Sequence, residues 1–338
     1  MTKSSDKPKL ALASAVIAAL VGLLIYQTVE LVKADERALA STEALAEALA
    51  DAMAAGCPEC PPAQPPPLFP ELYKPVEFSV DFYGMSYHGN SDNLIDRHVL
   101  FFGAYEKDVL HLMRDLSQAV GGGVFVDVGA NTGLHSLYMS RHAREVHAFE
   151  PYEPVLARLR AAIARNHITN IVVHPVGLGD QAARVVFHKP PERNLGSGSF
   201  VAEFQPGNEP AEDLEIVVGD AALAAAKVER VDLIKIDIEG YEQLALRGLR
   251  QTLERSRPVV IVEVTANPDH DETFKSEAAL RAAFPDRYQF LLVRQTARRG
   301  LSGEYQLLPY DFDMSVGQRM LVVYPSERAQ VLGLPAGS

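Results

Sequence analysis

The chain is poor in cysteine and in basic side chains. Its 338 residues include only 2 cysteines, Cys57 and Cys60, which excludes a scaffold built from disulfide bonds. Lysine and arginine number 32 against 44 aspartates and glutamates, a formal net charge of −12, so nucleic acid is not an expected partner. A hydrophobic content of 47% still predicts a globular core.

An apolar segment lies near the N-terminus. Residues 10–26 carry no charge, and the apolar character continues to residue 32 with Glu30 as the single acid. A helix over 10–32 would be about 34 Å long, enough to cross a bilayer. The alternative is a cleaved signal peptide, but its apolar core is usually shorter and ends at a site of small residues. We therefore predict a tail at 1–9 and an uncleaved transmembrane helix at 10–32.

The composition of the next segments predicts a spacer. Residues 33–56 are rich in alanine, glutamate and leucine, which predicts a helical stalk, and the proline-rich residues 57–71 predict an extended linker. Cys57 and Cys60 lie in that linker, without the strand, helix or further ligands that a redox or zinc site needs. Self-association through the stalk or through these cysteines stays open. A catalytic domain is expected at 72–325, followed by a tail at 326–338.

A glycine-rich turn follows a predicted strand at 124–128. The turn reads Gly129-Ala-Asn-Thr-Gly133 and leads into a helical pattern. Glycines there let the backbone approach a ligand, and the helix N-terminus offers free N–H groups. A second strand ends at Glu150, at a spacing from the turn close to the roughly 20 residues expected for a carboxylate that binds ribose hydroxyls. The pattern predicts a nucleotide-like ligand.

The turn favours S-adenosylmethionine over a dinucleotide. Dinucleotide sites usually read G-x-G-x-x-G, whereas Asn131 occupies the position of the second glycine here. S-adenosylmethionine carries no pyrophosphate, and Asp127 and Asn131 are suited to its polar groups. The remaining pattern alternates helix and strand, which predicts a parallel sheet. The expected helices are 154–166 and 277–284, the expected strands are 171–176, 231–238 and 258–264, and 288–293 and 319–324 are expected to form a final strand pair.

An ammonium and a carboxylate stand at the end of the fourth predicted strand. In the segment from Lys235 to Glu239, strand alternation places Lys235 and Asp237 on one face at the rim of the sheet. One interpretation is a structural ion pair that fixes strand register. The other is acid–base chemistry beside the cofactor, with either residue taking the proton. Asp237 and Glu239 as Mg²⁺ ligands are a further but less favoured option, so no metal site is predicted.

These segments together resemble the FkbM-type family of S-adenosylmethionine-dependent methyltransferases. The resemblance is carried by FVDVGANTGLHSLY from Phe125, HAFEPYEPV from His147, PVGLGD from Pro175 and above all DLIKIDIEGYE from Asp232. It implies a Rossmann-like class I fold with a mainly parallel seven-stranded sheet and a terminal antiparallel pair. It also implies cofactor-binding residues Asp127, Gly129, Asn131, Gly133, Glu150 and Asp180, the last near the adenine, and catalytic residues Lys235, Asp237 and Glu239.

The resemblance further implies methyl transfer to a hydroxyl of a sugar, glycolipid or secondary metabolite. The chain departs from the family at Gly219-Asp220, where a Leu-Asp pair is usual, and at 200–214, an acidic loop that contains proline. Two other functions stay open: an inert methyltransferase fold that acts as a membrane-tethered interaction module, and an NAD-dependent oxidoreductase. We expect a single-pass membrane protein whose catalytic domain is cytoplasmic because the cofactor is made there, although lysines before residue 10 favour the opposite orientation.

Overall fold

The computed structural model describes residues 75–265, 270–294, 303–311 and 318–335. Contacts divide the chain into Met1–Leu72 and Tyr73–Ser338, and every described residue lies in the second unit. The predicted tail, transmembrane helix and stalk, together with Cys57 and Cys60, lie outside the described residues. The predicted linker at 57–71 lies outside them too.

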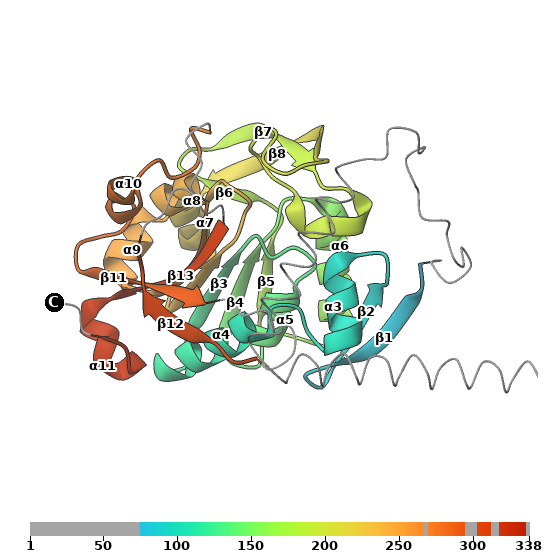
Figure 1. Cartoon of the computed structure of the whole chain (residues 1–338), viewed down its shortest axis with the longest axis horizontal. Coiled ribbons are helices and arrows are strands. Elements are labelled where there is room, and N and C mark those ends of the chain that lie inside the picture. The colour runs from blue at the N-terminus through green and yellow to red at the C-terminus, as the bar shows by residue number, and fades with distance from the viewer. Residues whose placement is uncertain (1–74, 266–269, 295–302, 312–317, 336–338) are drawn as a thin grey trace, which may run out of the picture. The chain divides into compact units, whose positions relative to one another are not determined.

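An eight-stranded sheet forms the centre of the described unit (Figure 1). Its strand order is β12-β11-β13-β10-β9-β3-β4-β5. The run from β10 to β5 is parallel, whereas β13 pairs antiparallel with both β10 and β11. The strands are β3 (Val124–Val128), β4 (Glu145–Phe149), β5 (Ile171–His174), β9 (Leu233–Ile236), β10 (Val259–Thr265), β11 (Tyr288–Arg294), β12 (Gln306–Pro309) and β13 (Gln318–Pro325).

The prediction of a mainly parallel α/β sheet ending in an antiparallel pair is confirmed, with β12 as an extra edge strand. Strands β3, β9 and β10 are apolar on both faces, which is the pattern of a sheet covered on both sides. Alternate residues serve the two faces: Phe125 and Leu233 belong to one core, and Val126 and Ile234 to the other.

Helices cover both faces of this sheet. Helices α4 and α5 contribute to the first core, α7 to α10 to the second, and α6 packs Leu156 and Leu159 against Ala148 of β4. The bounds are α4 (Lys107–Ala119), α5 (Leu134–Met139), α6 (Glu153–Arg165), α7 (Gly219–Ala225), α8 (Glu242–Gly248), α9 (Arg250–Ser256), α10 (Glu277–Ala282) and, near the C-terminus, η3 (Ser326–Arg328) and α11 (Ala329–Leu332). In such sheets ligands bind at the carboxyl ends of the parallel strands.

A second, three-stranded sheet was not predicted. It consists of β6 (Gly177–Gly179), β8 (Glu209–Val218) and β7 (Ala183–Lys189), in that order. The expectation of an acidic loop over 200–214 is wrong from Glu209 onward, because those residues pair antiparallel with β7. Most side chains of β8 are exposed, so the strand lacks the apolar alternation that marks a half-buried strand in a sequence.

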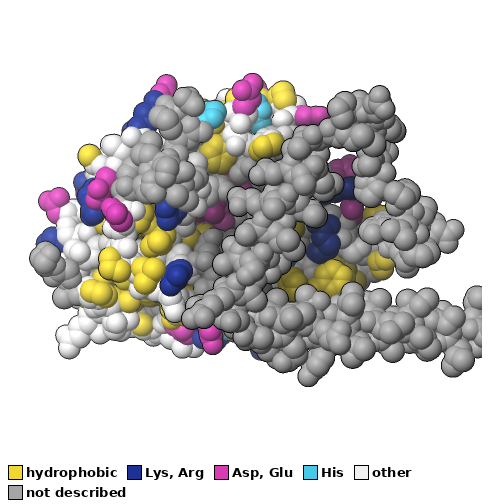
Figure 2. Space-filling view, in the orientation of Figure 1, with side chains coloured by type: hydrophobic (Ala, Val, Ile, Leu, Met, Phe, Trp, Pro, Cys, Tyr) yellow, Lys and Arg dark blue, Asp and Glu magenta, His cyan; other side chains and the backbone are white. Residues whose placement is uncertain are grey.

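The N-terminal part of the described unit is a hairpin followed by a helix, on the side of the sheet where α6 lies (Figure 1). Strands β1 (Glu77–Phe82) and β2 (Met85–Asn90) pair antiparallel, and α3 (Leu94–Phe102) follows. Buried Asp96 joins these parts, because its carboxylate accepts hydrogen bonds from Tyr87 at 2.6 Å and from Arg158 of α6 at 2.8 Å. On the described part of the face in Figure 2, acidic and basic side chains are interspersed.

The predicted localisation is corrected. No helix within the described ranges is long and apolar enough to cross a membrane. The segment at 10–32 on which the single-pass prediction rested lies outside those ranges. The single-pass localisation is therefore withdrawn.

Candidate active site

The glycine-rich turn after β3 is held in a left-handed conformation. Gly129 and Asn131 have φ angles of 86° and 51°. A Cβ on Gly129 would lie 2.0 Å from the carbonyl oxygen of Asp237, so only glycine lets this turn pack against the segment after β9. Position 133 requires glycine for a different reason: a Cβ there would lie 2.2 Å from the Leu159 side chain of α6. Gly129 thus shapes the site, and Gly133 lets α5 approach α6.

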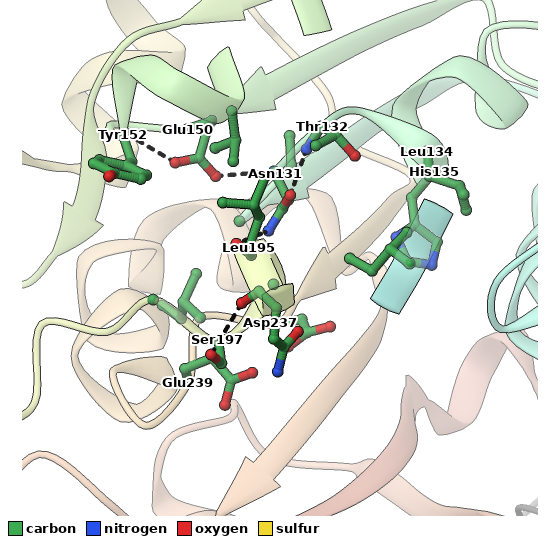
Figure 3. A pocket seen from close by; sticks show the side chains of 18 of the residues that line it. Asn131, Thr132, Leu134, His135, Glu150, Tyr152, Leu195, Ser197, Asp237 and Glu239 are labelled. Atoms are coloured by element: carbon green, nitrogen blue, oxygen red, sulfur yellow. Dashed lines mark hydrogen bonds between the residues drawn. The ribbon is translucent and has the colours of Figure 1, made fainter. Parts of the chain in front are cut away.

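Glu150 at the end of β4 holds the turn from the side. Its Oε2 accepts a hydrogen bond from the backbone N–H of Asn131 at 2.9 Å, and its Oε1 accepts one from that of Tyr152 at 2.8 Å (Figure 3). Burial raises the pKa of Glu150 to about 7, against the lowering effect of these two N–H groups. The result is a buried carboxyl group at the pocket wall, fixed by two backbone donors.

Lys235 and Asp237 form an ion pair at the end of β9. Lys235 is 1% exposed, and its Nζ donates to Asp237 Oδ2 at 2.8 Å. Burial alone would lower the pKa of Lys235, but the charges of Asp237, Asp127 and Glu106 outweigh it and raise that pKa. Burial alone would raise the pKa of Asp237, and the ammonium lowers it. Both groups are therefore charged at neutral pH.

Two further carboxyl groups lie beside this pair. Burial and the charge of Asp237 raise the pKa of Glu239 to about 7. The pKa of Glu263 on β10 is raised well above its usual value for the same reasons, with the charge of Glu239 added. Glu239 is fixed by side-chain amides, which donate to its Oε2 from Gln205 at 3.0 Å and from Gln318 at 2.7 Å.

The segment after β9 is held by Glu242, the first residue of α8. This glutamate is 1% exposed, and its Oε1 accepts from the backbone N–H groups of Ile238 at 3.1 Å and Gly240 at 3.0 Å. Burial raises its pKa to about 8. Glu242 thus fixes the backbone that carries the two acidic residues at 237 and 239.

A short helical segment, η2 (Glu192–Ser197), closes the pocket and joins its two halves. The side-chain amide of Asn131 donates to the carbonyl of Leu195 at 3.0 Å (Figure 3). Just beyond η2, Ser199 Oγ donates to the carbonyl of Glu239 at 2.6 Å. One loop therefore contacts both the turn after β3 and the segment after β9.

The pocket between these segments has a volume of about 370 Å³. The structure brings six of the residues predicted from the sequence to its wall: Gly129, Asn131, Glu150, Lys235, Asp237 and Glu239. In Figure 3, Glu150 and Asn131 lie together, and Asp237 and Glu239 lie across the pocket from them. A volume above 300 Å³ with a few convergent polar groups is typical of a small-molecule site.

Three predicted residues are not part of the wall. Asp127 is buried beneath it, where Ser136 Oγ donates to its Oδ2 at 2.6 Å. Gly133 packs against α6, as described above. Asp180 follows β6, is 33% exposed and faces Arg247 at 3.8 Å, so the structure does not bring it to the pocket.

Two acidic wall residues, Glu106 and Glu263, were not predicted as site residues from the sequence. Glu106 precedes α4 and is 6% exposed, and its Oε2 lies 3.5 Å from Nε2 of His135 on α5. Nothing near Glu106 in the sequence marks it. Glu263, in contrast, is a single acid inside the apolar strand VVIVEVT, and that pattern is a usable signal. His135 lies on α5, two residues after Gly133, and also lines the pocket.

Comparison with known proteins shows to which family the chain belongs. Residues 127–299, just over half of the chain, match the Methyltransferase FkbM domain. The chain belongs to the FkbM methyltransferase family. It is a methyltransferase enzyme, and the cofactor of the family is S-adenosylmethionine. The matched region contains the glycine turn, Glu150 and the Lys235–Asp237 pair.

Curated relatives of this FkbM methyltransferase include enzymes from archaea and fungi. It is 30% identical over 177 residues to the hexuronic acid methyltransferase AglP of Haloferax volcanii, covering 52% of this chain and 70% of that protein. It is 28% identical over 143 residues to methyltransferase 1 of Beauveria bassiana, covering 37% of this chain and 57% of that protein.

Two solved structures that align with the chain carry the name methyltransferase. The FkbM methyltransferase of Methylobacillus flagellatus aligns with a TM-score of 0.37 and 20% identity, over 59% of this chain and 43% of that one. The putative methyltransferase SMU.1697c of Streptococcus mutans, solved with S-adenosylhomocysteine, aligns with a TM-score of 0.36 and 12% identity. The alignment covers 64% of this chain and 97% of that one.

Proposed function

We propose that this enzyme transfers the methyl group of S-adenosylmethionine to a hydroxyl oxygen of a sugar-type acceptor. The observation that carries the proposal is the Lys235–Asp237 pair, which lines the same pocket as the glycine turn and Glu150. A methyl donor and a group able to receive a proton would therefore share one pocket. The relative AglP, named for methylation of a hexuronic acid, supports a sugar as the acceptor class.

The donor set of the pocket fits the cofactor. The Glu150 carboxyl group suits the two hydroxyls of a ribose, and the turn from Gly129 to Asn131 offers backbone atoms close to a ligand. The volume of about 370 Å³ suits a ligand of nucleoside size. When bound, the cofactor supplies an electrophilic methyl group on a sulfonium.

The residues at the end of β9 would then orient the acceptor hydroxyl and take its proton. Lys235 stays an ammonium because its pKa is raised, so it is not the base. Asp237 is ionised and accepts a hydrogen bond from the acceptor hydroxyl, which orients the oxygen. As the new C–O bond forms, the hydroxyl becomes strongly acidic, so a carboxylate of low pKa is basic enough to take its proton.

A transfer assay tests the proposal. Radiolabelled S-adenosylmethionine is incubated with neutral glycosides and uronic acids, and the products are analysed by mass spectrometry for O-methyl groups. Asp237→Asn should lower kcat by about 100-fold or more, while the Kd of S-adenosylhomocysteine changes little. Asp286→Asn, which alters an exposed aspartate after α10, is the matched control and should be fully active.

Two results would contradict the proposal. The first is an Asp237→Asn enzyme, shown by circular dichroism to be folded, that retains the wild-type kcat. The second is a product that carries the methyl group on nitrogen or carbon rather than on oxygen.

A further inference from the structure

Three acidic side chains converge where β9 and β10 end. Asp237 and Glu239 follow β9, and Glu263 belongs to β10. One carboxylate oxygen from each lies within 4.8 Å of the others. Oxygen ligands at about 2.0–2.6 Å from a common cation have such separations. The convergence is a result of tertiary structure, because residues 237 and 239 are carried past the strand end by the segment that Glu242 holds.

A bound divalent cation would balance the charge of this cluster in its ionised form. The three carboxylates then carry three negative charges, and the Lys235 ammonium at 2.8 Å from Asp237 supplies one positive charge. The remaining two negative charges equal the charge of one divalent cation. Excess buried charge of one sign is costly unless a ligand or ion neutralises it.

A fourth acidic side chain, from a different element, also faces this pocket. Glu106 precedes α4 and is more than nine-tenths buried. Its Oε2 makes no hydrogen bond within the described part of the chain, and neither does His135 Nε2 at 3.5 Å from it. Glu106 lines the same pocket as Asp237, Glu239 and Glu263. A buried polar atom without a hydrogen bond at a pocket wall points to a bound ligand.

We propose that Asp237, Glu239 and Glu263 bind a divalent cation, with Glu106 adding negative charge behind it. Carboxylate-only donors favour Mg²⁺ or Mn²⁺ over Zn²⁺ or copper. The inference deepens the proposed function, because a cation there would hold the acceptor through its hydroxyl oxygen and a neighbouring oxygen. That geometry favours a sugar diol over an isolated alcohol as the acceptor.

Direct binding of Mn²⁺ tests the site without any turnover. The full chain is titrated with Mn²⁺ alone, and the free ion is followed by electron paramagnetic resonance. The wild type should bind one ion with a Kd below about 1 mM. Glu263→Gln keeps the side-chain shape and should weaken binding by about 10-fold or more. Glu229→Gln, an exposed glutamate just before β9 at the opposite edge of the sheet, is the matched control and should bind as the wild type does.

The outcomes separate this inference from the proposed function. Equal Mn²⁺ binding by Glu263→Gln and the wild type, or no binding by either, would overturn the cation site. Full methyl transfer in excess EDTA would also overturn its role while leaving the methyltransferase assignment intact. Loss of transfer in EDTA that Mg²⁺ or Mn²⁺ restores for the wild type, but not for a folded Glu263→Gln, would support it.

Discussion

Replacing Lys235 by methionine removes a buried ammonium while nearly preserving side-chain volume. Lys235 is 1% exposed and lies 2.8 Å from Asp237 Oδ2, so Lys235→Met leaves Asp237 and the neighbouring Asp127 without a compensating cation. Removing one partner of a buried ion pair costs about 3–5 kcal/mol. In a domain of this size about 1 kcal/mol shifts Tm by about 2–4 °C, so Tm should fall by about 10 °C.

A double-mutant cycle measures the pair itself. Lys235→Met combined with Asp237→Asn removes both charges, so its cost should be smaller than the sum of the two single costs by about 1–3 kcal/mol. Free energies of unfolding are measured by urea titration of the full chain, followed by circular dichroism. Lys227→Met, which alters an exposed lysine after α7, should change stability by less than about 0.5 kcal/mol. A Lys235→Met cost below about 1 kcal/mol, or strictly additive costs, would show that the Lys235–Asp237 ion pair does not stabilise the fold as predicted.

Two further predictions concern the turn and the acid stability of the fold. Gly129→Ala should destabilise the protein by about 2 kcal/mol or more, because its Cβ would lie 2.0 Å from the carbonyl of Asp237. Gly121→Ala has a similar φ of 91° with open space, so a thermal melt of both variants isolates the clash, and equal Tm losses would count against it. Burial and the adjacent His147 lower the pKa of His174 to about 4. The unfolded chain therefore binds more protons than the fold between about pH 4 and 6.5, so stability is full above that window and declines as pH falls through it. His174→Gln should flatten this decline in urea titrations across pH, and an unchanged slope would argue against the assignment.

The central strands could be predicted from the sequence because they are buried on both faces. Strand β3 was predicted with its observed bounds, and the final pair β11 and β13 differs from the prediction by a residue or less at each end. Strand β9 is shorter than predicted: it spans Leu233–Ile236, and the chain turns at Glu239 and Gly240, which have positive φ angles. Strand β8 escaped detection because its exposed acidic side chains resemble those of a loop.

The site was predictable where its residues share one local motif. Asn131 and Glu150 belong to the strand–turn–helix pattern, and the structure joins them by a hydrogen bond of 2.9 Å. Asp180 was expected from resemblance alone, and the local chain instead directs it toward Arg247. Glu106 reaches the pocket only because α4 packs on the sheet, and no spacing rule relates it to residues more than 100 positions away. Tertiary packing, rather than local pattern, supplies that part of the site.

We propose that the methyl donor binds between the glycine turn and Glu150 and faces the segment after β9. Hydrogen–deuterium exchange of the full chain, with and without S-adenosylhomocysteine, tests this placement, because it reports which backbone amides a ligand protects. We expect slower exchange at residues 129–135, 150–155 and 237–240. Protection confined to other parts of the domain, with unchanged exchange at these three segments, would contradict it.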